Sequence, residues 1–127
     1  MKNAINNPVM AEGKKLLDFS MEEINRAEED VVNYLVCHHT RHAIANFLKV
    51  FLANHDEAFG DEPIHELLEK CSRIDDRFAQ IDLSGIVCSK VTVEQNDCYC
   101  LDTHKLRDCV RNARQIEQMV SAQVPVY

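Results

Sequence analysis

The sequence contains few of the residues that interrupt regular secondary structure. Only three glycines and three prolines occur among its 127 residues, and long stretches contain neither. An all-β domain needs frequent turns, so this scarcity disfavours sheets and favours helices. A chain of this length can also bury a hydrophobic core within one domain without disulfides or metal ions.

Long apolar segments are also absent. The first residues, MKNAINNPVMAEGKKLLDF, lack the apolar region of a secretory signal. No apolar run approaches the roughly 20 residues that a transmembrane helix requires. Both absences predict a cytoplasmic protein without a membrane segment. In that reducing compartment we expect free thiols at the six cysteines, positions 37, 71, 88, 98, 100 and 109.

The common motifs of catalytic and metal sites are missing as well. There is no Gly-x-Ser-x-Gly turn and no glycine-rich phosphate loop. Two clusters of cysteine and histidine, at 37–42 and 98–109, lack the Cys-x-x-Cys spacing of structural zinc sites. His38 and His42 stand one helical turn apart, so transition-metal chelation stays open as an alternative. The prediction is nevertheless that the protein holds no cofactor and no metal ion.

The N-terminal half predicts helical structure after a loose start. Residues 1–12 show no periodicity and are expected as a loose tail, followed by a single helical domain over 13–124. Ser20, with Glu23 three residues later, has the spacing of a capping box. Helical character is expected from there to about His55, with a break or bend around Cys37–Thr40 left open.

The C-terminal half predicts further helices. Pro63 suits the first turn of a second helix, whose apolar side ends at Ile74. A short helix is expected over 75–81, an irregular connector around 87–96, and a last helix that ends near Gln123. Short loops between helices favour an antiparallel up-and-down bundle of four to five helices. Apolar spacing of three and four residues predicts the core, which comprises Ile44, Phe47, Leu48, Phe51, Leu67, Leu68, Val110, Ala113 and Ile116.

The basic residues of the last helix form the main candidate binding site. At 100° per residue, one side of this helix carries His104, Arg107, Arg111 and Arg114. The net charge of −7 makes the surface as a whole repel nucleic acid, so phosphate must be bound by such a local patch. Lys49 is a second contributor. The alternative is intramolecular pairing with acidic residues, which is worth about 0–1 kcal/mol for each exposed pair.

His65 raises a separate question, because with Glu62 it forms the Glu-x-x-His spacing of di-iron bundles. Such a site needs this motif twice and further inward carboxylates. The chain has one copy, and Pro63 places it at a helix start. We therefore expect a structural role for His65 at the hinge between two helices, and we also count it as the sixth candidate nucleotide- or partner-binding residue.

The stretch HAIANFLKVFLANHDEAFGDEPIHELLEKC resembles the central signature of HEPN domains (higher eukaryotes and prokaryotes nucleotide-binding). In that family a lysine-bearing helix is followed by a hinge and a Pro-x-His-x-Leu helix start. The last helix, LRDCVRNARQIEQMV, resembles that of the family too, and the likeness runs from about Val31 to Val120. The matching positions are Ala43, Lys49, Leu52, Pro63, His65, Leu67 and Leu68.

Two departures shape what this resemblance implies. Ala45 stands where the family often has a glutamate, and no arginine is followed by a histidine after four to six residues, the pattern of ribonuclease members. The resemblance therefore implies a small, non-catalytic HEPN homodimer that binds a nucleotide or RNA, or accompanies a separate nucleotidyltransferase chain. One alternative is a diverged ribonuclease toxin using His104 with Arg107 or Arg111. Another is a metal-binding bundle built on the cysteine and histidine clusters.

Overall fold

The computed structural model of the chain is built from helices that pack around one central helix. It describes residues 2–27, 29, 31, 33–81 and 103–123, and these contain no β-strand. The elements are α1 (Lys2–Ile24), α2 (Asn33–Asn54), α3 (Ile64–Ile74), the 3₁₀ helix η2 (Asp76–Gln80) and α4 (Thr103–Gln123). The predicted all-α bundle is confirmed.

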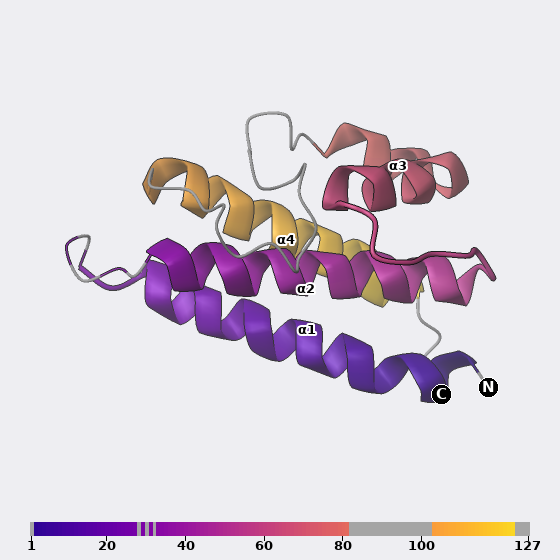
Figure 1. The fold of residues 1–127 in the computed structure, drawn as a ribbon, viewed down its shortest axis with the longest axis horizontal. Coiled ribbons are helices and arrows are strands. Elements are labelled where there is room, and N and C mark those ends of the chain that lie inside the picture. Colours follow the sequence, from indigo (N-terminus) through magenta and orange to yellow (C-terminus); the bar gives the residue numbers. More distant parts are fainter. Residues whose placement is uncertain (1, 28, 30, 32, 82–102, 124–127) are drawn as a thin grey trace.

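Helix α2 lies between the other helices, and α1 packs along it in the opposite direction (Figure 1). Helix α4 runs in the same direction as α2, since its first residues lie beside the start of α2. Residues 82–102 separate the described parts of the chain before α4. The expected irregular connector around 87–96 lies outside the described residues.

The N-terminal prediction is wrong. Helix α1 begins at Lys2, so the described part of residues 1–12 is helical and not a loose tail. Ser20 does not cap a helix start: it is buried in the last turns of α1, and its hydroxyl donates to the Val36 carbonyl oxygen at 3.4 Å. The polar beginning of this helix and Pro8 inside it conceal its helical character in the sequence. The chain also leaves the helical conformation after α1 and returns to it at α2, so the interruption lies before Asn33 and not around Cys37–Thr40.

The inward side of α1 alternates large and small residues. Met10, Leu17 and Ile24 are buried at seven-residue intervals, with Gly13 and Ser20 buried between them. At Gly13 the backbone approaches Phe47 of α2 so closely that a Cβ atom would lie 2.6 Å from its Cε1 atom. The absence of a side chain at Gly13 thus lets α1 and α2 pack tightly.

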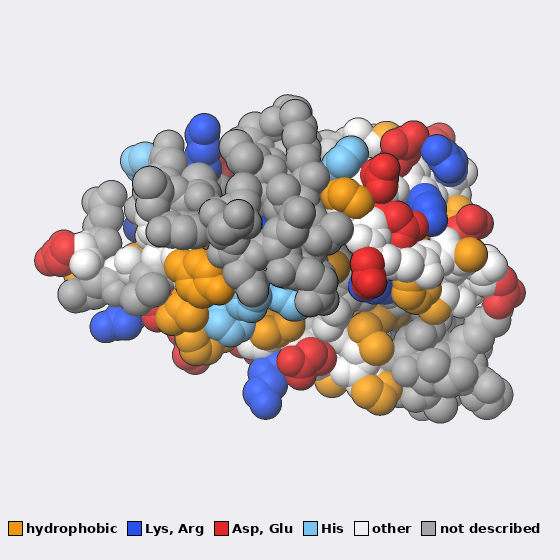
Figure 2. All heavy atoms as spheres, viewed as in Figure 1, with side chains coloured by type: hydrophobic (Ala, Val, Ile, Leu, Met, Phe, Trp, Pro, Cys, Tyr) orange, Lys and Arg blue, Asp and Glu red, His pale blue; other side chains and the backbone are white. Residues whose placement is uncertain are grey.

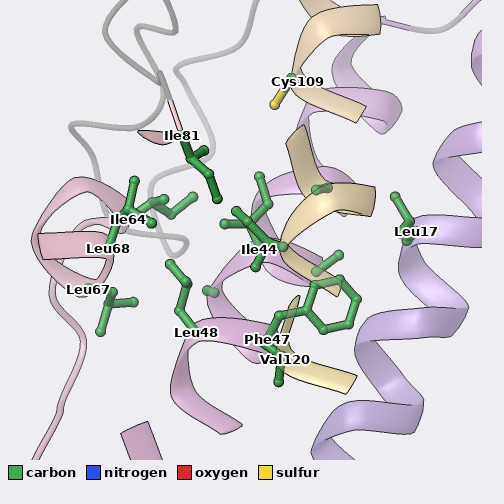
Figure 3. Close-up of a cluster of buried hydrophobic side chains, with 14 of the residues drawn as sticks. Leu17, Ile44, Phe47, Leu48, Ile64, Leu67, Leu68, Ile81, Cys109 and Val120 are labelled. Atoms are coloured by element: carbon green, nitrogen blue, oxygen red, sulfur yellow. The ribbon is translucent and has the colours of Figure 1, made fainter. Parts of the chain in front are cut away.

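The predicted core is confirmed, because all nine residues named from the sequence are buried. Figure 3 shows how side chains from all four α-helices meet in it. Ile74 is the exception among the predicted apolar positions, with 37% of its surface exposed. Helix α3 ends there, and Phe78 of η2 fills the core instead, with its ring centroid 4.6 Å from that of Phe51.

Three cysteines fall among the described residues. Cys37, Cys71 and Cys109 are free and buried, as predicted for thiols that pack like small apolar side chains. Burial raises the pKa of the Cys71 thiol to about 12, which keeps it protonated and unreactive. The cysteines at 88, 98 and 100 lie outside the described residues. In the described ranges, no helix combines the length and apolar character needed to cross a membrane.

Candidate functional site

One surface of α4 carries a group of basic side chains. The residues of α4 that face the core recur every three or four positions, which leaves the opposite side of the helix to solvent. The exposed side chains on that side define the α4 basic face, which consists of His104, Arg107, Arg111 and Arg114. The structure thus brings together four of the six site residues predicted from the sequence.

The charge of this helix differs from that of its surroundings. Helix α4 has four lysines and arginines against two acidic residues. The segment 55–80, which includes α3 and η2, has eight acidic residues against three lysines and arginines. Figure 2 shows acidic side chains gathered over the α3 end of the molecule. Positive charge is therefore concentrated on α4 within an acidic protein.

The alternative of intramolecular pairing is realised at Arg111. Its Nη1 atom donates to Asp108 Oδ1 at 2.9 Å, one turn earlier on the same helix, and both side chains are exposed. Such a pair is worth about 0–1 kcal/mol, so an external anion can displace it. Arg114 contacts α1 instead, with Nη1 3.7 Å from Met21 Sδ. Both guanidinium groups remain mostly in contact with solvent.

Lys49 belongs to a different surface. It is half-buried on α2, with Nζ 3.9 Å from Asp61 Oδ1 of the segment before α3. Its stem lines a shallow apolar pocket with Val9, Val50 and Phe59. The structure therefore places Lys49 against α1 and the α2–α3 segment, and not on the α4 basic face.

Glu62 and His65 have different surroundings. The Glu62 carboxylate is hydrogen-bonded in the hinge, the segment between α2 and α3. It accepts hydrogen bonds from the Lys70 ammonium group and from the Gly60 backbone N–H. Lys70 also donates to the Ala58 carbonyl oxygen at 3.1 Å. His65 is exposed in the first turn of α3. Glu62 and Lys70 therefore fasten the hinge to α3.

The interaction between Glu62 and Lys70, called the clamp below, should make the free energy of unfolding depend on pH. The hydrogen bond from Lys70 holds the pKa of the Glu62 carboxyl below its ordinary value. A carboxyl whose pKa is lower in the folded state stabilises the protein at pH values above its unfolded pKa of about 4.3. This contribution is lost as the pH falls through the lower, folded-state pKa. We expect Glu62→Gln to lower the free energy of unfolding by about 0.5–1.5 kcal/mol at pH 7 and progressively less in acid.

Urea unfolding at several pH values between neutral and strongly acidic conditions measures this difference. Glu66→Gln is the control, because Glu66 is an exposed glutamate in the first turn of α3. It should leave the acid dependence of the wild type nearly unchanged. Parallel profiles for Glu62→Gln and the wild type would contradict the clamp.

Arg41 is a buried charge that the sequence reasoning missed. It lies on α2 with none of its surface exposed. Its position, four residues after Cys37 and three before Ile44, places it on the core-facing side of the helix, so the spacing contained the signal. Arginine remains protonated in proteins, so this site holds a permanent positive charge inside the bundle.

Histidines flank Arg41 on α2 and contact aromatic rings. His38, His39 and His42 are partly buried. Their ring partners include Tyr34 and Phe19. Within the described ranges, no three or more His, Cys, Asp and Glu side chains are placed to hold a metal ion. Of the second cysteine and histidine cluster, these ranges include His104 and Cys109 but not Cys98 and Cys100.

Comparisons of the chain with protein-family models, with curated proteins and with solved structures give no match. The class that the fold defines is therefore a small all-α bundle. The α4 basic face is the feature of that bundle from which function can be argued.

Proposed function

We propose that this chain is a non-catalytic, HEPN-like binding module whose α4 basic face holds a phosphate-bearing ligand. The observation that carries the proposal is the concentration of three exposed arginines and one histidine on a single side of one helix. The sequence resemblance supports the same class, since it implies binding of a nucleotide or RNA, or association with a nucleotidyltransferase chain. The cytoplasmic location and the homodimer are part of this proposal.

Arginine is well suited to this role. Its planar guanidinium group offers paired N–H donors that match two oxygens of a phosphate, and charge-assisted hydrogen bonds are stronger than neutral ones. Arg107 and Arg111 are one turn apart and both exposed. They can therefore contact neighbouring phosphates or two oxygens of one phosphate without any rearrangement of the backbone.

The non-catalytic part of the proposal rests on the sequence. His104 precedes Arg107 on α4, which reverses the order of arginine and histidine in ribonuclease members of the family. A diverged ribonuclease that uses His104 is the competing function. Incubation of the purified protein with RNA separates the two, because turnover of RNA that disappears in His104→Ala would favour the enzyme.

Removal of two arginines tests the binding face. We expect Arg107→Ala/Arg111→Ala to weaken binding of ATP or of a short RNA at least about tenfold, since each charged hydrogen bond is worth about 1.5–3 kcal/mol. The slope of log affinity against log salt concentration should also become shallower. Isothermal titration at several salt concentrations measures both quantities.

The matched control is Arg73→Ala/Arg77→Ala, which removes the same charge from exposed positions on α3 and η2. This variant should bind like the wild type, and circular dichroism should show that both variants stay helical. Titration with a nucleotidyltransferase chain tests the partner form of the proposal. Equal affinities of wild type and both variants for every ligand would overturn the role of the α4 basic face.

A further inference from the structure

The histidines of α2 form a surface cluster that is separate from the α4 basic face. His38, His39 and His42 are all partly exposed, and they occupy two successive turns of the helix. Figure 2 shows histidine side chains beside hydrophobic ones in the lower middle of the view, on the face formed by α1 and α2. Three of the six histidines of the chain are thus concentrated within five residues.

His38 and His42 lie close enough to act on one ion. They are four residues apart on an unbroken helix, and their ring centroids are 4.5 Å apart. Paired histidines at this spacing project their rings from one side of a helix, which is the arrangement that helical zinc motifs use. Metal–nitrogen bonds of about 2.0–2.1 Å allow two such rings to coordinate a shared ion.

The surroundings distinguish His38 and His42 from His39. The Nδ1 atom of His39 lies 2.8 Å from the Leu35 carbonyl oxygen, and its ring centroid lies 4.4 Å from that of Phe19. The ring centroid of His39 lies 5.6 Å from that of His38, farther than the 4.5 Å between His38 and His42, so His42 is the better placed second ligand. The ring of Tyr34 lies nearly parallel to that of His38, at an interplanar angle of 11°, and restricts its orientation.

We propose that His38 and His42 form a two-point chelate for a divalent transition-metal ion that prefers imidazole ligands, such as Ni²⁺, Cu²⁺ or Zn²⁺. Water fills the remaining coordination positions, so the ion exchanges and is not a structural centre. With only two protein ligands, we expect an affinity in the micromolar range. This site is independent of the proposed anion binding on α4.

Titration with Ni²⁺ tests the chelate, because Ni²⁺ favours imidazole and does not oxidise the thiols of this chain. The wild type should bind one Ni²⁺ saturably in isothermal titration under reducing conditions. His42→Ala should bind about 100-fold more weakly, since the second imidazole of a chelate acts at high effective concentration. His39→Ala, which removes the neighbouring imidazole, should bind within about threefold of the wild type.

A second measurement does not depend on the folding of any variant. Paramagnetic Ni²⁺ should broaden the imidazole NMR signals of His38 and His42 in the wild type at low occupancy, before those of His55, His65 and His104. Wild-type binding weaker than about 1 mM, equal binding by His42→Ala, or broadening centred on another histidine would each overturn the proposal.

Discussion

Replacement of Phe47 by alanine should lower the free energy of unfolding by about 3–5 kcal/mol, the usual cost of truncating a fully buried phenylalanine. None of the Phe47 surface is exposed. Its ring lies against Gly13 of α1 and beside Val120 of α4, so three helices meet at this side chain (Figure 3). The cavity left by truncation cannot collapse without moving a whole helix, which places the expected loss in the upper part of the range for core substitutions.

Urea unfolding followed by circular dichroism measures this loss. Phe59→Ala is the matched control, because Phe59 is the same residue type with 42% of its surface exposed. It should cost about 1 kcal/mol or less, as expected for a largely exposed side chain. Similar losses for the two variants would contradict the packing of α1, α2 and α4 around Phe47.

Replacement of Gly13 by valine should destabilise the protein by about 3 kcal/mol, because added methyl groups in a filled core force neighbouring side chains or helices apart. A Cβ atom at Gly13 would lie 2.6 Å from Phe47 Cε1 and 3.0 Å from Cδ1. These ring atoms belong to a side chain with none of its surface exposed. Glycine is normally the poorer helix former by about 1 kcal/mol, so destabilisation by a larger residue identifies the close contact as its cause.

A double-mutant cycle measures the coupling between Gly13 and Phe47. In a Phe47→Leu background, Gly13→Ala should cost less than in the wild type, because the ring atoms that meet the new Cβ are gone. Ala11→Val is the control for valine in a helix, since Ala11 is exposed on the same helix. Additive effects in the cycle, or an equal cost for Ala11→Val, would contradict a contact between Gly13 and Phe47.

The sequence predicted the helices whose buried sides are made of large apolar residues. In α2, α3 and α4 such residues recur every three or four positions, and that recurrence is sufficient to place their core. Helix α1 follows a different rule, because glycine and serine occupy every second inward position. Small residues contribute little hydrophobicity of their own, so the pattern becomes meaningful only when the partner helix supplies Phe47.

The candidate site also has a part that could be predicted from the sequence and a part that could not. The α4 basic face was predictable, since it depends only on the angle between residues of one helix. The position of Lys49 was not, because its neighbours Val9 and Asp61 come from two other segments. No local pattern encodes such an encounter between segments. The burial of Arg41 could have been predicted from its spacing along α2. However, a charged residue is not expected on the core-facing side of a helix.

The basic side chains of α4 and the acidic residues of the α3 region give the two parts of the protein opposite local charges. At low ionic strength, about 0.01 M, fields extend roughly 30 Å, and an approaching polyanion senses the net charge of −7 and is repelled. At about 0.1 M the range shortens to roughly 10 Å, so the distant acidic residues are screened while α4 still attracts at contact. Association with a polyanion should therefore be fastest at intermediate salt, where repulsion at long range has faded and attraction at short range persists.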